Sequence, residues 1–256
     1  MEVLPRENVY GHLQRLDWLR GHLQPEDRVV EFGCGTGRLI TLPLRASGYD
    51  VVGVDLDQRS IDHGRGLLRE AGLDSAALQA VDLRDLPGPF EAVIASEILE
   101  HLDDRELDES LEITRDKLVA GGKLLVTTPN GYSLFELENL LWYRTGADRL
   151  YGRLRSGRFA RRLRRLKAQR ADWSDQPEPM TLADSPHKQR FTWRSIHETL
   201  SRSGFEVVEA RGAILFCGPF SDVALSGLPR VMALNKRLGR RFPRVASDFY
   251  LAAVKR

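Results

Sequence analysis

The chain has little cysteine, with only Cys34 and Cys217 among its 256 residues. Two cysteines are too few for a framework of disulfides, and neither has a partner at the spacing of metal ligands. The sequence therefore predicts neither a disulfide-stabilised fold nor a cysteine cluster, and no metal ligand is expected from it.

A long apolar run is also missing. No stretch approaches the about 20 residues that span a bilayer, and the opening MEVLPRENVY lacks the apolar centre of a signal peptide. With 42% hydrophobic and 29% charged residues, the chain suits one α/β domain with insertions. The expected localisation is cytoplasmic, with peripheral contact to a membrane left open.

The best-defined motif is RVVEFGCGTGRL, from Arg28 to Leu39. It joins a short apolar run, glycines at every second place (Gly33, Gly35 and Gly37) and the start of a helical pattern. This order is typical of a strand, a tight turn and a helix whose positive end points at the turn. A polar ligand is expected there.

Two acidic residues indicate what that ligand carries. Asp55 ends the next apolar strand, VVGVDLD, about 20 residues after the first, where an acid accepts hydrogen bonds from ribose hydroxyls. Glu31 lies just before the turn, and the third glycine comes one residue earlier than in the dinucleotide pattern. A carboxylate there suits an ammonium or sulfonium group and would repel a pyrophosphate. A nicotinamide-dependent oxidoreductase is therefore disfavoured.

Strand and helix patterns alternate along most of the chain. Helices are expected over 8–23, 58–72, 107–118 and 193–203, and strands over 49–55, 76–81, 89–96, 123–129, 205–210 and in the closing ASDFYLAAVKR. The strand at 89–96 is mostly apolar, as burial on both faces of a parallel sheet requires. The pattern predicts an α/β fold with a doubly wound sheet that binds its ligand at the carboxyl ends of the strands.

The region 131–190 breaks this alternation. It begins with the aromatic and apolar GYSLFELENLLWYRTG, and from Arg149 to Arg170 it holds nine arginines, one lysine and no acid. The spacing of its arginines and leucines predicts a basic amphipathic helix. A solvated face on a cap, an anionic substrate, anionic lipid headgroups and nucleic-acid phosphates all remain open as explanations.

Six motifs together resemble the class I S-adenosylmethionine (SAM)-dependent methyltransferases, and among them the small-molecule group typified by the ubiquinone O-methyltransferases. The motifs are VEFGCGTG, VVGVDLD, AVDLRDL, FEAVIASEILEHLDD, AGGKLLVTTPN and HKQRFTWRSIHETLSRSGFEVVE. The resemblance implies a Rossmann-like, seven-stranded, mostly parallel sheet with helical cap insertions, whose last two strands form an antiparallel hairpin. It divides the chain into a SAM-binding half (1–130), a basic and aromatic cap or lid (131–190) and the rest of the sheet (191–256), with a second, irregular insertion near 212–245.

The resemblance also implies site residues for SAM and its product S-adenosylhomocysteine. It assigns the methionine end to the motif Glu31, Gly33, Cys34, Gly35 and Gly37, the ribose to Asp55 with Leu56 and Asp57, the adenine to Asp82 and Leu83, and the neighbourhood of the sulfonium to Ser96 and Glu97. Asp57 could instead cap the next helix, and Asp82 could be a turn residue at the end of a strand.

Transfer of the methyl group needs an in-line approach of the acceptor, and a base only if the acceptor must lose a proton. His101 and His187 are the candidate bases, because both are expected at the carboxyl edge of the sheet. His101 could alternatively cap a helix or brace the SAM loop.

The expected activity is methyl transfer to a hydroxyl of a small-molecule or lipid-linked acceptor, and an anionic acceptor is left open. The chain has SEIL where base-modifying enzymes carry N-P-P-Y, and it has no Pro-Cys nucleophile, so nucleic acid is a less favoured substrate. The arginine-rich segment keeps RNA or another anionic polymer open. A SAM-fold binding protein without catalysis is the non-enzyme alternative.

Overall fold

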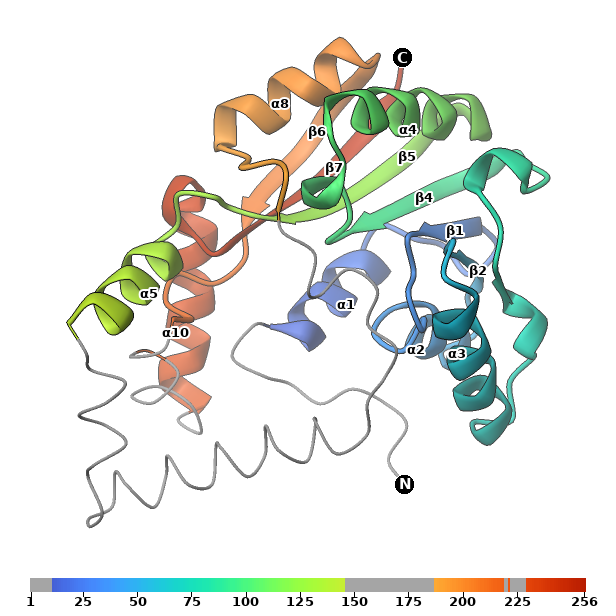
Figure 1. Cartoon of the computed structure of the whole chain (residues 1–256), viewed down its shortest axis with the longest axis horizontal. Coiled ribbons are helices and arrows are strands. Elements are labelled where there is room, and N and C mark those ends of the chain that lie inside the picture. Colours follow the sequence, from blue (N-terminus) through green and yellow to red (C-terminus); the bar gives the residue numbers. More distant parts are fainter. Residues whose placement is uncertain (1–10, 146–186, 219–220, 222–228) are drawn as a thin grey trace.

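The computed structural model describes residues 11–145, 187–218, 221 and 229–256. Within them, seven strands form one sheet in the order β3-β2-β1-β4-β5-β7-β6 (Figure 1). The strands are β1 (Arg28–Phe32), β2 (Asp50–Val54), β3 (Leu78–Gln79), β4 (Phe90–Ser96), β5 (Leu118–Pro129), β6 (Phe205–Gly212) and β7 (Asp248–Lys255). Strands β1 to β5 pair in parallel, and β7 is antiparallel to both β5 and β6. This confirms the predicted seven-stranded, mostly parallel sheet and its terminal hairpin.

Helices cover both faces of the sheet (Figure 1). The helices α1 (His12–Arg20), α2 (Thr41–Ala46) and α3 (Gln58–Glu70) lie on one face, and α4 (Asp104–Lys117) and α8 (Trp193–Arg202) lie on the other. The strand order reverses between β1 and β4, which is the switch point where doubly wound sheets bind ligands.

The apolar character of β4 follows from this two-sided cover. Val93 packs in the cluster that α4 and α8 supply, whereas the next residue, Ile94, packs in the cluster of α1 and α2. Neither side chain has exposed surface. Successive side chains of a strand point to opposite faces of the sheet. A central strand with both faces covered is therefore apolar at every position instead of alternating between apolar and polar residues.

The second insertion differs from the expectation. The region near 212–245 was expected to be irregular, but it contains the helix α10 (Pro229–Arg241), which packs against β6. Pro229 occupies the first helical position, where its missing N–H has no helical partner to lose.

The first insertion opens with α5 (Leu134–Arg144), which presents apolar side chains outward. Tyr132, Leu137, Leu140 and Leu141 are 46–66% exposed. The predicted basic helix at Arg149–Arg170 lies outside the described residues, and the division into three regions stays a prediction. Within the part of the chain that the structure describes, no helix combines the length and the apolar character needed to cross a membrane.

Candidate functional site

The glycine turn after β1 adopts the backbone that only glycine takes easily. Gly33, Gly35 and Gly37 have φ of 68°, 54° and 65°. A Cβ on Gly33 would lie 2.6 Å from Cγ1 of Ile98, the second residue after β4. A Cβ on Gly35 would meet no atom within 4 Å. The turn therefore packs closely against the segment after β4 and leaves open space at Gly35.

Asp55 ties this turn to the end of β2. Its Oδ2 accepts a hydrogen bond from the Gly35 N–H (2.8 Å), and its Oδ1 accepts one from the Asp57 N–H (2.9 Å). The neighbouring Leu56 is 76% exposed. The carboxylate thus lies at an open edge beside the glycine turn, where the sequence predicts the ribose.

Asp57 has the capping role that the sequence left open. Its Oδ2 accepts a hydrogen bond from the Ser60 N–H (3.0 Å) at the start of α3. The hydrogen bond from the Ser60 hydroxyl, with this one from the Ser60 N–H, lowers the pKa of Asp57 below its usual range. Its contact with a cofactor stays a prediction.

Glu31 is buried behind the turn rather than exposed within it. Its Oε2 accepts hydrogen bonds from the Thr41 N–H (2.9 Å) and the Thr41 hydroxyl. Burial raises the pKa of Glu31 to about 7, and burial also raises the pKa of the neighbouring Cys34 thiol. The Glu31 carboxylate therefore anchors the start of α2 through Thr41. Its predicted contact with the methionine end of SAM is not tested by these hydrogen bonds.

The buried carboxyl of Glu31 predicts a pH dependence of stability. Since its pKa in the folded chain, about 7, exceeds the ordinary 4.5, the folded chain holds this proton more tightly than the unfolded chain. The contribution to stability is full below about pH 4.5 and is lost as the pH rises through about 7. Urea denaturation of wild type and Glu31→Gln should show the wild type losing free energy of unfolding relative to the variant across this window. A difference independent of pH would contradict the prediction.

The residues predicted for the adenine have structural roles of their own. Asp82 accepts a hydrogen bond from the Arg84 N–H (2.7 Å) and caps the 3-10 helix Leu83–Asp85. The side chain of Leu83 is buried in the core, which leaves only its main chain to reach a ligand. Their contact with adenine stays a prediction.

The end of β4 carries strain. Glu97 has φ of 55°, the only positive φ outside glycine among the described residues. The Glu97 N–H donates to the Thr127 carbonyl (2.8 Å), its carboxylate pairs with Arg15 (3.1 Å), and the Ser96 and Thr127 hydroxyls are 2.7 Å apart. A residue held in a costly backbone conformation by several partners is a common feature of functional sites.

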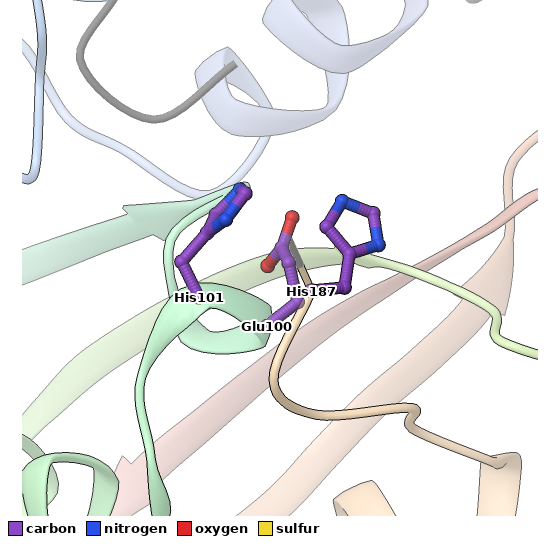
Figure 2. A group of neighbouring side chains, drawn as sticks. All are labelled: Glu100, His101 and His187. Atoms are coloured by element: carbon purple, nitrogen blue, oxygen red, sulfur yellow. The ribbon is translucent and has the colours of Figure 1, made fainter. Parts of the chain in front are cut away.

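The structure brings His101 and His187 together beyond β4, although they are far apart in sequence. His101 ends the 3-10 helix Leu99–His101. The carbonyl of Glu100 accepts hydrogen bonds from the N–H groups of Lys188 (2.8 Å) and Gln189 (2.9 Å), which fixes the segment after the first insertion. The centroids of the two imidazole rings are 5.0 Å apart in an edge-to-face arrangement, and the Glu100 side chain lies in the same group (Figure 2). Their catalytic role stays a prediction.

Glu100 is the residue of this group that the sequence analysis missed. Its side chain is buried, and its Oε2 accepts a hydrogen bond from the Thr128 hydroxyl (3.1 Å). Burial, reinforced by the charge of Glu97, raises the pKa of Glu100 well above its usual range. Burial also lowers the pKa of His101, and the charge of His187 adds to this effect. Position gave the only signal, since Glu100 directly precedes His101 after a central strand.

The comparisons with known proteins agree with the fold. A family model described as "Methyltransferase domain" matches residues 9–210. A ubiquinone biosynthesis O-methyltransferase of Chelativorans sp. (strain BNC1) is 30% identical over 157 residues, which are 58% of this chain and 60% of that protein. A sphingolipid C9-methyltransferase of Candida albicans is 30% identical over 128 residues, 47% of this chain and 25% of that protein. The chain thus spans between a quarter and three fifths of these relatives.

A solved structure adds the same fold over nearly the whole chain. The magnesium protoporphyrin IX methyltransferase of Synechocystis PCC 6803, crystallised with S-adenosylhomocysteine, aligns with a TM-score of 0.54 at 14% identity, over 96% of this chain and 81% of that one. Together with the family match over most of the sequence, this confirms the resemblance. The chain belongs to the class I methyltransferases, the family whose cofactor is S-adenosylmethionine.

Proposed function

We propose that this chain transfers a methyl group from S-adenosylmethionine to a hydroxyl of a small-molecule or lipid-linked acceptor. One observation carries the proposal: the glycine turn with Asp55 and the group Glu100, His101 and His187 meet at one edge of the sheet. The glycine turn, Asp55 and the Glu100–His101 segment follow β1, β2 and β4, which are neighbours, and the Gly33–Ile98 contact joins the two halves. The Glu100 carbonyl holds the segment that carries His187. When bound, the cofactor supplies an electrophilic methyl group on a sulfonium.

The residues on the β1–β2 side fit such a cofactor. The open space at Gly35 admits a ligand close to the backbone, and the Asp55 carboxylate offers acceptor lone pairs beyond the two main-chain hydrogen bonds it already receives. Ribose hydroxyls are donors that match it. The described residues therefore can hold the nucleoside beside the glycine turn.

The residues after β4 suit the acceptor side. The lowered pKa of His101 keeps its imidazole neutral near pH 7, with a lone pair able to accept a proton. In this proposal His101 and His187 assist the acceptor hydroxyl in losing its proton as the new C–O bond forms. Positioning of the acceptor opposite the sulfur supplies the rest of the rate gain.

The nature of the acceptor is proposed from the neighbouring surfaces. Helix α5 exposes the apolar side chains of Leu137, Leu140 and Leu141, and α10 carries five cations and no acid within PRVMALNKRLGRR. An apolar surface on α5 and a cationic surface on α10 favour an amphiphilic, anionic acceptor. Two relatives are named for ubiquinone biosynthesis and for a sphingolipid. The arginine-rich segment Arg149–Arg170 would supply further positive charge for an anionic substrate or a membrane.

Deuterated S-adenosylmethionine tests the proposal. The protein is incubated with it and a panel of anionic and lipid-linked hydroxyl compounds, with RNA in a parallel sample, and products are analysed by mass spectrometry. We expect one labelled methyl ether among the hydroxyl compounds. Labelled RNA instead would support the polymer alternative, and cofactor binding without transfer to any acceptor would support a binding protein.

The histidines are tested on the same acceptor. We expect the double variant His101→Ala, His187→Ala to lower kcat by about 100-fold or more, the lower end for acid–base assistance. His197→Ala is the matched control, because its Nδ1 bonds only within α8 to the Trp193 carbonyl. Full turnover in the double variant would rule out assistance by either histidine.

A further inference from the structure

Residues of α1, β6 and α10 enclose a hollow of about 300 Å³. The two helices lie on the same side of the sheet, away from α4 and α8 (Figure 1). Three cationic and two acidic side chains line the hollow, namely Arg211, Lys236, Arg240, Asp17 and Glu209. Its volume is at the lower end of the range of ligand pockets, about 300–1,000 Å³, so it suits a small group.

Both acidic side chains of the hollow already have partners. The indole N–H of Trp18 donates to Oε1 of Glu209 (3.1 Å), and Nε2 of His22 lies 3.2 Å from Oε2. Asp17 is 75% exposed, and its Oδ1 lies 3.7 Å from a guanidinium nitrogen of Arg20. Among the described residues, neither acid forms an ion pair with an arginine of the hollow. The charge of these arginines is therefore not neutralised by a carboxylate in direct contact.

Arg211 is held in place by aromatic rings and keeps an unused donor. Its guanidinium carbon lies 5.7 Å from the ring centroid of Trp18 and 5.6 Å from that of Tyr250. Its Nε is buried and has no hydrogen-bond partner in the described part of the chain. A buried polar nitrogen without a partner is costly, and native proteins pair nearly all of them. An oxygen acceptor in the hollow would satisfy it.

A second guanidinium lies close to the first. Arg240 is in the last turn of α10, and its charge acts on Arg211. Burial, with the charge of Arg240 adding to it, lowers the pKa of Arg211, and the charge of Glu209 offsets part of this effect. Two like charges in one hollow repel each other, whereas an anion between them is attracted by both.

We propose that Arg211 and Arg240 bind a phosphate monoester in this hollow. A guanidinium presents its N–H groups as a planar fork that matches the oxygens of a phosphate. A phosphate monoester carries a charge of about −1.5 to −2 at pH 7, which corresponds to two arginines. Lys236 lines the same hollow and adds to its positive charge.

This would be a second ligand site, separate from the site of methyl transfer. None of the residues that line the hollow belongs to the glycine turn or to the group Glu100, His101 and His187. Binding there does not depend on the proposed function. The sequence did not indicate the site, because Arg211 and Arg240 are brought together only by the packing of α10 against β6.

The test is an NMR titration of the full-length, ¹⁵N-labelled protein with inorganic phosphate at constant ionic strength. The assigned signal of the Trp18 indole N–H reports on the hollow, because Arg211 stacks on this ring. We expect a saturable shift in wild type. The affinity should be about tenfold lower or less in Arg211→Gln and in Arg240→Gln, because each variant loses a charge-assisted hydrogen bond.

Arg237→Gln is the matched control. It removes one exposed charge from the same helix without changing the lining of the hollow, so it should bind phosphate like wild type. All four proteins should bind S-adenosylhomocysteine equally, which shows that each is folded.

Two further probes distinguish the sources of a phosphate monoester. A saturable shift with glycerol 3-phosphate that is lost in Arg211→Gln would assign the site to a soluble compound. Sedimentation with vesicles of phosphatidylcholine and phosphatidic acid that is lost in the same variant would assign it to a lipid headgroup.

The absence of a saturable shift in wild type, or equal phosphate affinity in wild type and both site variants, would overturn the site. An equal loss in Arg237→Gln would also overturn it, because the effect would then be one of net charge. Displacement of phosphate by S-adenosylhomocysteine would place the anion in the cofactor site instead of the hollow. Because the titration contains no acceptor, failure of methyl transfer leaves its outcome unchanged.

Discussion

Asp55→Asn is expected to bind S-adenosylhomocysteine about 100-fold more weakly than wild type. In wild type, the two oxygens of Asp55 accept hydrogen bonds from the N–H groups of Gly35 and Asp57. The substitution removes the negative charge and replaces one of these acceptor oxygens by an amide donor. Hydrogen bonds to a charged group contribute about 1.5–3 kcal/mol each, and about 1.4 kcal/mol corresponds to tenfold in affinity. Calorimetric titration of both proteins measures the effect, with NAD as the second ligand.

The matched control is Asp57→Asn, two residues away on the same turn. Its side chain caps α3, and asparagine caps a helix as well as aspartate does, so stability should stay within about 0.5 kcal/mol of wild type and any loss of affinity should be smaller than in Asp55→Asn. Equal losses in both variants would assign the effect to general disturbance of the turn. Undiminished binding in Asp55→Asn would remove Asp55 from the cofactor site, and binding of NAD in place of S-adenosylhomocysteine would overturn the cofactor.

Local patterns were enough to predict most of the fold. Strands such as Phe90–Ser96 lie between covering helices and so become continuously apolar, which is visible without any knowledge of their neighbours. The glycines of the turn were identifiable because their backbone excludes other residues. The exception was α10, which lies in a region that was expected to be irregular. It begins at Pro229, and a proline at the first helical position is compatible with a helix.

The candidate site was less predictable because its contacts join distant segments. The position of His187 depends on main-chain hydrogen bonds from Lys188 and Gln189 to Glu100, and no periodicity records such contacts. The burial of Glu31 and its hydrogen bonds to Thr41 likewise depend on how α2 packs behind the turn. Residue types and spacing thus identified most residues of the candidate site. Which of these residues contact one another could be known only from the fold.

A close approach between α3 and the glycine turn predicts a large effect at Gly64. A Cβ at Gly64 would lie 2.2 Å from the Thr36 carbonyl oxygen and 2.6 Å from Leu78 Cδ1. The Thr36 oxygen belongs to the turn itself, so Gly64→Ala must displace either α3 or the cofactor loop. We expect a loss of about 3 kcal/mol in the free energy of unfolding, at the upper end for overpacking, and weaker binding of S-adenosylhomocysteine. Guanidinium denaturation and calorimetric titration measure the two effects.

Gly66, on the same helix, separates packing from helix propensity. A Cβ there meets no atom within 4 Å, so Gly66→Ala should stabilise the chain by about 0.5–1 kcal/mol, the usual gain of alanine over glycine within a helix. The same substitution two residues apart is thus expected to change stability in opposite directions. If Gly64→Ala were also stabilising and left affinity unchanged, α3 would not support the turn at this point. The cofactor loop would then depend on Asp55 and on the Gly33–Ile98 contact for its position.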